Sequence, residues 1–141
     1  MEPDRHPNEQ SLYEGVPYDY AALVPAGSLL FTAGACPLDS DGVVVAPGDH
    51  VAQAERALQN LLAVLLRHGA GPEHLVRTTI YVVGGSADLV EVWKAYSEGL
   101  TPSRPPSTLL GVAALGYPDQ LVEIEAIAAL VDGQEPGAPG H

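Results

Sequence analysis

The sequence predicts an α+β domain in which two helices cover one face of a mixed β-sheet. Strand-like and helical patterns follow each other in the order strands, helix, strand, helix, strand, strand. Each helical pattern has one apolar side, which a sheet can bury. Two strand patterns, Ser28–Gly34 and Leu75–Val83, are apolar on both faces. We therefore expect a partner subunit to cover the face of the sheet opposite the helices.

The chain is expected to form one domain over residues 13–131. Residues 1–12 are polar and predict a flexible lead-in, whereas residues 132–141 are rich in Gly and Pro and predict a disordered tail. Near the start of the domain, PYDYAALV (Pro17–Val24) predicts a short strand. The apolar run SLLFTAG (Ser28–Gly34) predicts a buried strand.

A hairpin and a long helix should follow. The turn residues Asp39–Gly42 precede VVVA (Val43–Ala46), which predicts the second strand of a hairpin. Asp49 is a suitable helix N-cap, and Gly69 suits the left-handed position just after a helix. Between them the apolar residues have helical spacing: Val51, Ala54, Leu58, Leu61 and Leu65.

The central part of the chain predicts a strand and a second helix. LVRTTIYVV (Leu75–Val83) is rich in β-branched residues, which favour strands. Ser86 is placed to cap the helix, and Asp88 in its first turn suits the helix dipole. The apolar side of this helix consists of Leu89, Val92, Trp93, Tyr96 and Leu100.

Two strands are expected to end the domain. The proline-rich loop Thr101–Pro106 leads into TLLGVAAL (Thr108–Leu115), and the turn GYPDQ separates it from LVEIEAIAAL (Leu121–Leu130). Residues of a strand alternate between its two faces, so Glu123 and Glu125 should share one face. The opposite face should carry Val122, Ile124, Ala126 and Ala128.

Composition limits the function. The chain of 141 residues has 18 acidic and 6 basic residues and a net charge of −12, which disfavours nucleic acid as a partner. Its longest apolar runs are too short to cross a membrane, and the polar first ten residues do not resemble a signal peptide. We therefore expect a cytoplasmic protein without a membrane partner.

Several segments, in order, resemble the Rid (reactive intermediate deaminase, YjgF-like) family. VPYDYAALVPAGSLLFTAGACPLDSDG is similar to its PYSQAV…G…LFTSGQIPLD…G. AQAERALQNLLAVLLRHGAG is similar to AQ…AL.N…VLEAAGA, and VRTTIYVV to VKTTVYL. LVEIEAIA is close to the family's V-EIEAIA. The similarity extends from about Pro17 to Ala129. The assignment to the family rests on the order and spacing of these segments taken together.

The resemblance implies a chorismate-mutase-like fold and a homotrimer with a ligand cleft between each pair of subunits. It also implies the hydrolysis of reactive imines and enamines without a metal or cofactor. In such proteins an arginine in the motif P-A-R-[ST] holds the substrate carboxylate through two hydrogen bonds. The resemblance further implies that backbone groups and a water positioned by a glutamate carry out the hydrolysis.

The residues that match this arginine motif depart from it. When the strand that begins at Thr108 is aligned without gaps through to the EIE motif, Ser107 falls on the arginine position. Serine has no charge and cannot hold a carboxylate as a guanidinium does. Arg104, three residues upstream, either reaches back into the cleft or is a solvated loop residue. We therefore expect the substrate to differ from the usual carboxylate-bearing amino-acid imines.

The resemblance assigns further site residues. Glu123 matches the family's cleft glutamate and is, with Ser107, a candidate catalytic residue; as an alternative, it is an ordinary exposed strand carboxylate. The candidate substrate-binding residues are Tyr18, Gly34, Trp93, Arg104 and Leu109. Trp93 replaces a common asparagine and is expected either to pack in the core or to form a stacking wall for a flat ligand.

The cysteine and the histidines do not indicate a catalytic or metal-binding site. Cys36 is the only cysteine, which excludes an intrachain disulfide, and it is expected to be a small buried apolar residue. His50, His68 and His74 do not have the spacing of a metal site. Two alternatives to an imine hydrolase remain: a non-catalytic trimer that binds small molecules and, more remotely, an endoribonuclease, which the net charge disfavours.

Overall fold

The computed structural model describes residues 11–22 and 24–131, and it confirms the α+β fold. Four strands form one sheet, in the order β1 (Gly27–Phe31), β4 (Val122–Val131), β2 (Leu75–Val83) and β3 (Ser107–Val112). Strand β4 is antiparallel to both of its neighbours, whereas β2 and β3 are parallel. The sheet is therefore mixed, as the order of the sequence patterns predicts.

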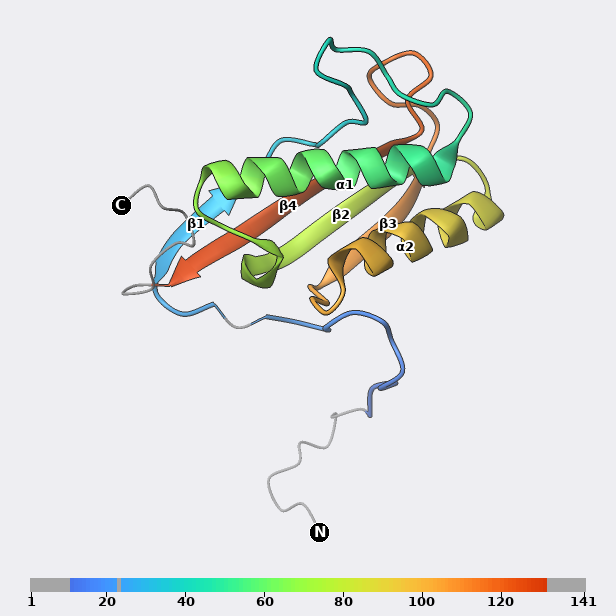
Figure 1. Cartoon of the computed structure of the whole chain (residues 1–141). Helices are drawn as coiled ribbons and strands as arrows, with labels where there is room; N and C mark the ends of the chain where they lie inside the picture. Colours follow the sequence, from blue (N-terminus) through green and yellow to red (C-terminus); the bar gives the residue numbers. More distant parts are fainter. Residues whose placement is uncertain (1–10, 23, 132–141) are drawn as a thin grey trace.

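Two helices, α1 (His50–Arg67) and α2 (Ser86–Leu100), lie on the same face of this sheet (Figure 1). A short 3-10 helix, Pro72–His74, leads from α1 into β2. The buried core lies between the helices and the sheet, and its larger members are Leu58, Leu61, Leu65, Ile80, Val82, Val92, Tyr96, Leu100, Val122 and Ile124. The predicted apolar sides of both helices therefore face the sheet.

The residues observed at the helix ends match the predicted caps for α1 but not for α2. The Asp49 carboxylate accepts a hydrogen bond from the Ala52 amide at 3.0 Å, so the predicted cap of α1 is confirmed. Gly69 has a φ of +74°, the left-handed conformation expected after the helix. The predicted cap of α2 is wrong, because Gly85 occupies the N-cap and Ser86 is the first helical residue. Asp88 instead reaches back and accepts from the Gly85 amide at 3.0 Å.

Two predicted strands do not form. Residues 17–22 and 24 have no strand. A hydrogen bond from the Asp19 amide to the Arg104 carbonyl, at 2.9 Å, attaches this segment to the loop after α2. Val43–Ala46 makes only an isolated bridge, between Leu38 and Val44. The Asp39 carboxylate accepts from the Asp41 and Val43 amides, and Ala46 has a φ of +46°. A side-chain-capped turn and a left-handed residue thus replace the extended hairpin.

The sheet face opposite the helices is open in the single chain. Glu123, Glu125 and Ile127 of β4 lie on this face, because their neighbours Val122, Ile124 and Ala126 are buried against the helices. Phe31 and Leu29 of β1 are 68% and 51% exposed, so the prediction of a buried first strand is wrong for one chain. That a partner subunit covers this face stays a prediction.

Candidate functional site

Ser107 lies in a cluster of three hydroxyl groups. It begins β3 and pairs with Thr78 of β2, while Tyr96 approaches from α2. The Ser107 Oγ lies 2.7 Å from the Thr78 Oγ1 and 2.9 Å from the Tyr96 hydroxyl, and it donates to the Pro105 carbonyl at 2.9 Å. The Thr78 and Tyr96 oxygens are 2.5 Å apart. Burial raises the pKa of Tyr96, so its phenol is neutral.

Ser107 lines two cavities, one of about 450 Å³ and one of about 370 Å³. Tyr18, Trp93, Ser107, Thr108 and Leu109 line the smaller cavity, which we call the aromatic pocket. The Tyr18 ring meets the Trp93 ring edge to face, with centroids 6.2 Å apart. The structure therefore brings four of the predicted site residues together: Tyr18, Trp93, Ser107 and Leu109.

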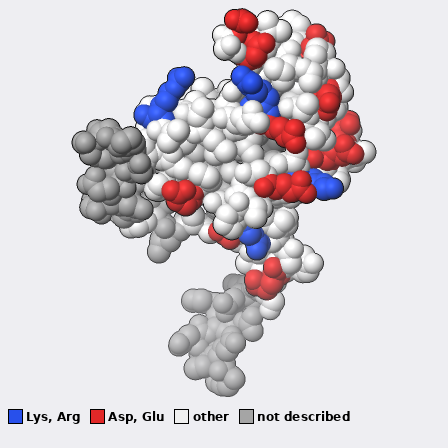
Figure 2. All heavy atoms as spheres, viewed as in Figure 1, with Lys and Arg blue, Asp and Glu red and all other residues white. Residues whose placement is uncertain are grey.

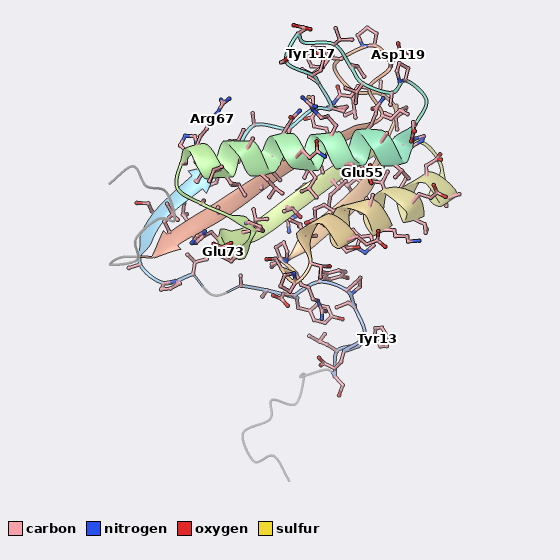
Figure 3. The ribbon with its side chains drawn as sticks, in the orientation of Figure 1. Tyr13, Glu55, Arg67, Glu73, Tyr117 and Asp119 are labelled. Carbon is pink, nitrogen blue, oxygen red and sulfur yellow. The ribbon has the colours of Figure 1, made fainter. Side chains whose placement is uncertain are left out.

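Arg104 lines the larger cavity and not the aromatic pocket. Its guanidinium Nη2 donates to the Val16 carbonyl at 2.5 Å, and its own carbonyl accepts from the Asp19 amide. Arg104 thereby attaches the segment before β1 to the loop after α2. Figure 3 shows Tyr13 on this segment, at the opposite end of the molecule from Tyr117 and Asp119. Arg104 is thus not a purely solvated residue: it shares the larger cavity with Trp93 and Ser107, but it does not line the aromatic pocket.

Glu123 and Gly34 form a second group, on the open face of the sheet. The Glu123 Oε1 accepts from the Gln120 Nε2 at 3.1 Å and from the Cys36 Sγ at 3.5 Å. A Cβ at residue 34 would overlap the Glu123 carboxylate where it now lies, so glycine at this position lets the carboxylate approach the backbone closely. Cys36 is only partly buried, and both burial and the Glu123 carboxylate raise its pKa. The expectation of a buried apolar cysteine is therefore corrected to a thiol that donates to Glu123.

The two groups are separate within one chain. Ser107 pairs with Thr78 and Glu123 with Tyr81, and residues three apart on β2 point to opposite faces of the sheet. The predicted site residues thus divide into a helix-side group, with Ser107, and an open-face group, with Glu123.

Three residues of these groups escaped sequence reasoning. Tyr96 looks like one more apolar residue of α2, and Thr78 is one of several β-branched residues in its strand. Gln120 lies in a turn, yet it is 3% exposed, and its amide oxygen accepts from the Tyr117 amide. A polar side chain two residues before the apolar start of a strand is a weak signal, so only the structure identifies Gln120.

Within residues 11–22 and 24–131, no cluster of three His, Cys, Asp or Glu side chains could hold a metal ion. None of the helices in the described part of the chain is long and apolar enough to cross a membrane. Acidic side chains outnumber basic ones on the face that Figure 2 shows. The fold and its two polar groups define a small α+β protein with an aromatic-lined pocket whose lining side chains carry no formal charge.

Comparison with known proteins agrees with this class. The family model described as Endoribonuclease L-PSP matches residues 12–130. The chain therefore belongs to this family, whose members include the RutC and Rid (YjgF) proteins. It is 41% identical over 114 residues to Protein DfrA of Myxococcus xanthus, covering 79% of this chain and 84% of DfrA.

Other relatives link the family to chemistry and to the fold. The 3-aminoacrylate deaminase RutC of Acinetobacter baylyi is 30% identical over 125 residues, covering 86% of this chain and 98% of RutC. Among solved structures, the Rid-family protein YyfB of Yersinia pestis superposes with a TM-score of 0.80 at 33% identity, covering 89% of this chain and 98% of YyfB. The YjgF gene product of E. coli gives a TM-score of 0.65 at 31% identity, covering 83% of this chain and 90% of that chain.

Proposed function

We propose that this protein hydrolyses small imines or enamines that lack a carboxylate, without a metal or cofactor, in the cytoplasm. The main support for this proposal is the aromatic pocket beside Ser107, because none of the described Asp, Glu, Lys, Arg or His residues lines it. Its lining residues are Tyr18, Trp93, Ser107, Thr108 and Leu109. Family membership supports deaminase chemistry, because one relative is named 3-aminoacrylate deaminase. That relative's substrate contains a carboxylate, whereas here the aromatic pocket offers a serine hydroxyl in place of a guanidinium.

Glu123 is the proposed general base. Water adds to the carbon of the C=N bond, the carboxylate takes a proton from the water, and the nitrogen gains protons as the C–N bond breaks. The products are a carbonyl compound and ammonia. Gln120 and Cys36 both donate to Oε1, which leaves Oε2, beside Gly34, to hold the water. Two side-chain donors thus orient one carboxylate oxygen, and neither of them binds the other oxygen.

The complete site requires two copies of the chain. Ser107 and Glu123 lie on opposite faces of the sheet, so one protomer does not present both to one small substrate. The open face carries exposed Phe31, Leu29 and Leu110, an apolar surface of the kind that a partner subunit buries. We propose a homotrimer in which Glu123 of one subunit faces the aromatic pocket of the next.

Two other functions can be distinguished from this one by experiment. A non-catalytic trimer would bind small molecules in the same pocket, which the replacement of the family's arginine by Ser107 favours. The description of the matching family model favours an endoribonuclease. The net charge of −12 opposes the approach of a phosphate backbone.

The test is ammonia release from an imine generated in solution by an amino-acid or amine oxidase. We expect faster release with the wild-type protein than with buffer, for an imine made from an uncharged amine such as benzylamine. Glu123→Gln should lower the rate at least about a hundredfold, which is the usual contribution of a general base. Equal rates for protein and buffer would exclude the hydrolase and leave the binding protein.

A further inference from the structure

The hydroxyl cluster at Ser107 has more close contacts than protons. Four oxygen–oxygen distances of 2.9 Å or less join Ser107, Thr78, Tyr96 and the Pro105 carbonyl. Three hydroxyl groups carry only three protons. The carbonyl has no hydrogen, so Ser107 donates its single proton to Pro105.

The other two protons also stay inside the cluster. The Thr78 and Tyr96 oxygens are 2.5 Å apart and would repel each other without a proton between them. One of the two hydroxyls therefore donates to the other, and that other donates to Ser107. Ser107 thus accepts one hydrogen bond, donates one, and keeps a single lone pair for a ligand.

Only Ser107 of the three hydroxyl residues can present this lone pair to a ligand. Thr78 is 0% and Tyr96 is 2% exposed, whereas Ser107 is partly buried and lines the aromatic pocket. At Ser107 the pocket therefore offers a hydrogen-bond acceptor, because the proton of this hydroxyl is donated to Pro105.

The guanidinium groups of Arg104 and Arg77 are hydrogen-bonded to other residues. Arg104 donates to the Val16 carbonyl and lines the other cavity. Arg77 donates to the Thr108 Oγ1 at 3.0 Å, and it is next to Thr78 on β2, so it points to the opposite face of the sheet from Ser107. The hydrogen-bond partners of the Ser107 Oγ are Thr78, Tyr96 and the Pro105 carbonyl, and neither guanidinium is among them.

Two rings form the wall of the same pocket. Tyr18 and Trp93 lie edge to face, and the Trp93 ring is also 5.1 Å from that of Tyr96. Aromatic faces attract cations as well as other rings, and tryptophan does so most strongly. The net charge of −12 adds a field that draws cations toward the protein.

We propose that the aromatic pocket selects ligands that present a cationic N–H donor on an aromatic body, and that it discriminates against carboxylates. The N–H group would donate to the Ser107 Oγ, and the ring would pack against Tyr18 and Trp93. The ligands of this kind are aromatic amines and the iminium ions made from them. That the iminium ions are substrates rests on the proposed function.

Trp93 is the only tryptophan in the chain, so its fluorescence reports on the pocket directly. Benzylammonium and benzoate are matched probes, because both carry one ring and opposite charges. In high salt, which screens the overall field, we expect benzylammonium to bind at least about tenfold more tightly than benzoate. Ser107→Ala should weaken benzylammonium binding about fivefold, and Ser107→Arg should reverse the preference.

Ser103→Ala is the control, because Ser103 lines only the larger cavity, and it should leave both affinities unchanged. Equal or tighter binding of benzoate, no quenching by either probe, or a full preference retained in Ser107→Ala would each overturn the proposal. Binding is measured without turnover. A protein that prefers benzylammonium but hydrolyses no imine would retain this inference and lose only the proposed function.

Discussion

Ser107 and Glu123 lie on opposite faces of one sheet, on strands that flank β2. Their partners on β2, Thr78 and Tyr81, are three residues apart, which corresponds to about 10 Å along the strand. The sheet itself separates the two side chains. A site that uses both must take one from each of two subunits, so catalysis and assembly should be lost together.

The first prediction concerns that assembly. Phe31, 68% exposed on the open face, should lie in the interface between subunits. Phe31→Glu places a charge there, and burying an unpaired charge is costly, so the trimer should dissociate into monomers. Sedimentation velocity measures this directly. Val90→Glu is the matched control, because Val90 is 69% exposed on α2, and it should stay trimeric. Dissociation of both variants, or of neither, would contradict the proposed interface.

A second prediction concerns the thiol beside Glu123. Burial and the negative charge of Glu123 both raise the pKa of Cys36, because both disfavour the thiolate. Glu123→Gln removes the charge and keeps the size of the side chain, so the pKa of Cys36 should fall toward its usual value. The rate of alkylation by iodoacetamide, followed against pH, should then rise at a lower pH than in the wild type. An unchanged or higher midpoint would show that Cys36 and Glu123 do not interact.

A third prediction concerns the loops that hold Gln120. Gln53 of α1 is fully buried, and its amide nitrogen donates to the Ala46 and Asp119 carbonyls while its oxygen accepts from the Leu121 amide. Figure 3 shows Asp119 in the loops beyond the end of α1. Gln53→Ala leaves these backbone groups without partners and should lower the free energy of unfolding by about 2–4 kcal/mol.

Urea denaturation measures this loss, with Gln59→Ala as the control. Gln59 is an exposed residue of the same helix, and its replacement should change the stability by less than about 0.5 kcal/mol. Similar losses of stability in the two variants would mean that the hydrogen bonds of Gln53 do not stabilise the fold, and that replacing any glutamine of this helix by alanine has the same effect.

Where hydrophobic period and capping chemistry agree, the sequence predicts the fold well. The alternation in β4 correctly places Glu123 opposite the buried Val122 and Ile124, and Asp49 correctly marks the start of α1. The prediction fails where one polar group outweighs β-propensity. The Asp39 carboxylate accepts from the Val43 amide and Ala46 has a φ of +46°, so the pairing of Val43–Ala46 stops at a single bridge.

The candidate site divides in a similar way. Tyr18, Trp93, Ser107 and Leu109 gather in one pocket, as the family resemblance implies. The hydroxyl cluster does not follow from the sequence, because Thr78 and Tyr96 belong to patterns that core packing alone explains. The bond between Arg104 and Val16 joins two irregular segments, and no periodicity predicts where a long side chain in a loop ends.

Mixed assemblies test the two-subunit site most directly. Trp93→Ala destroys the aromatic pocket and Glu123→Gln destroys the base, so each variant alone should be inactive toward an imine of benzylamine. In co-assembled trimers, about a quarter of the sites should combine an intact pocket with an intact Glu123 from the neighbouring subunit. We expect the mixture to recover about that fraction of the wild-type rate. A mixture whose trimers are shown by native mass spectrometry to be mixed, and which stays as inactive as either variant, would contradict the account.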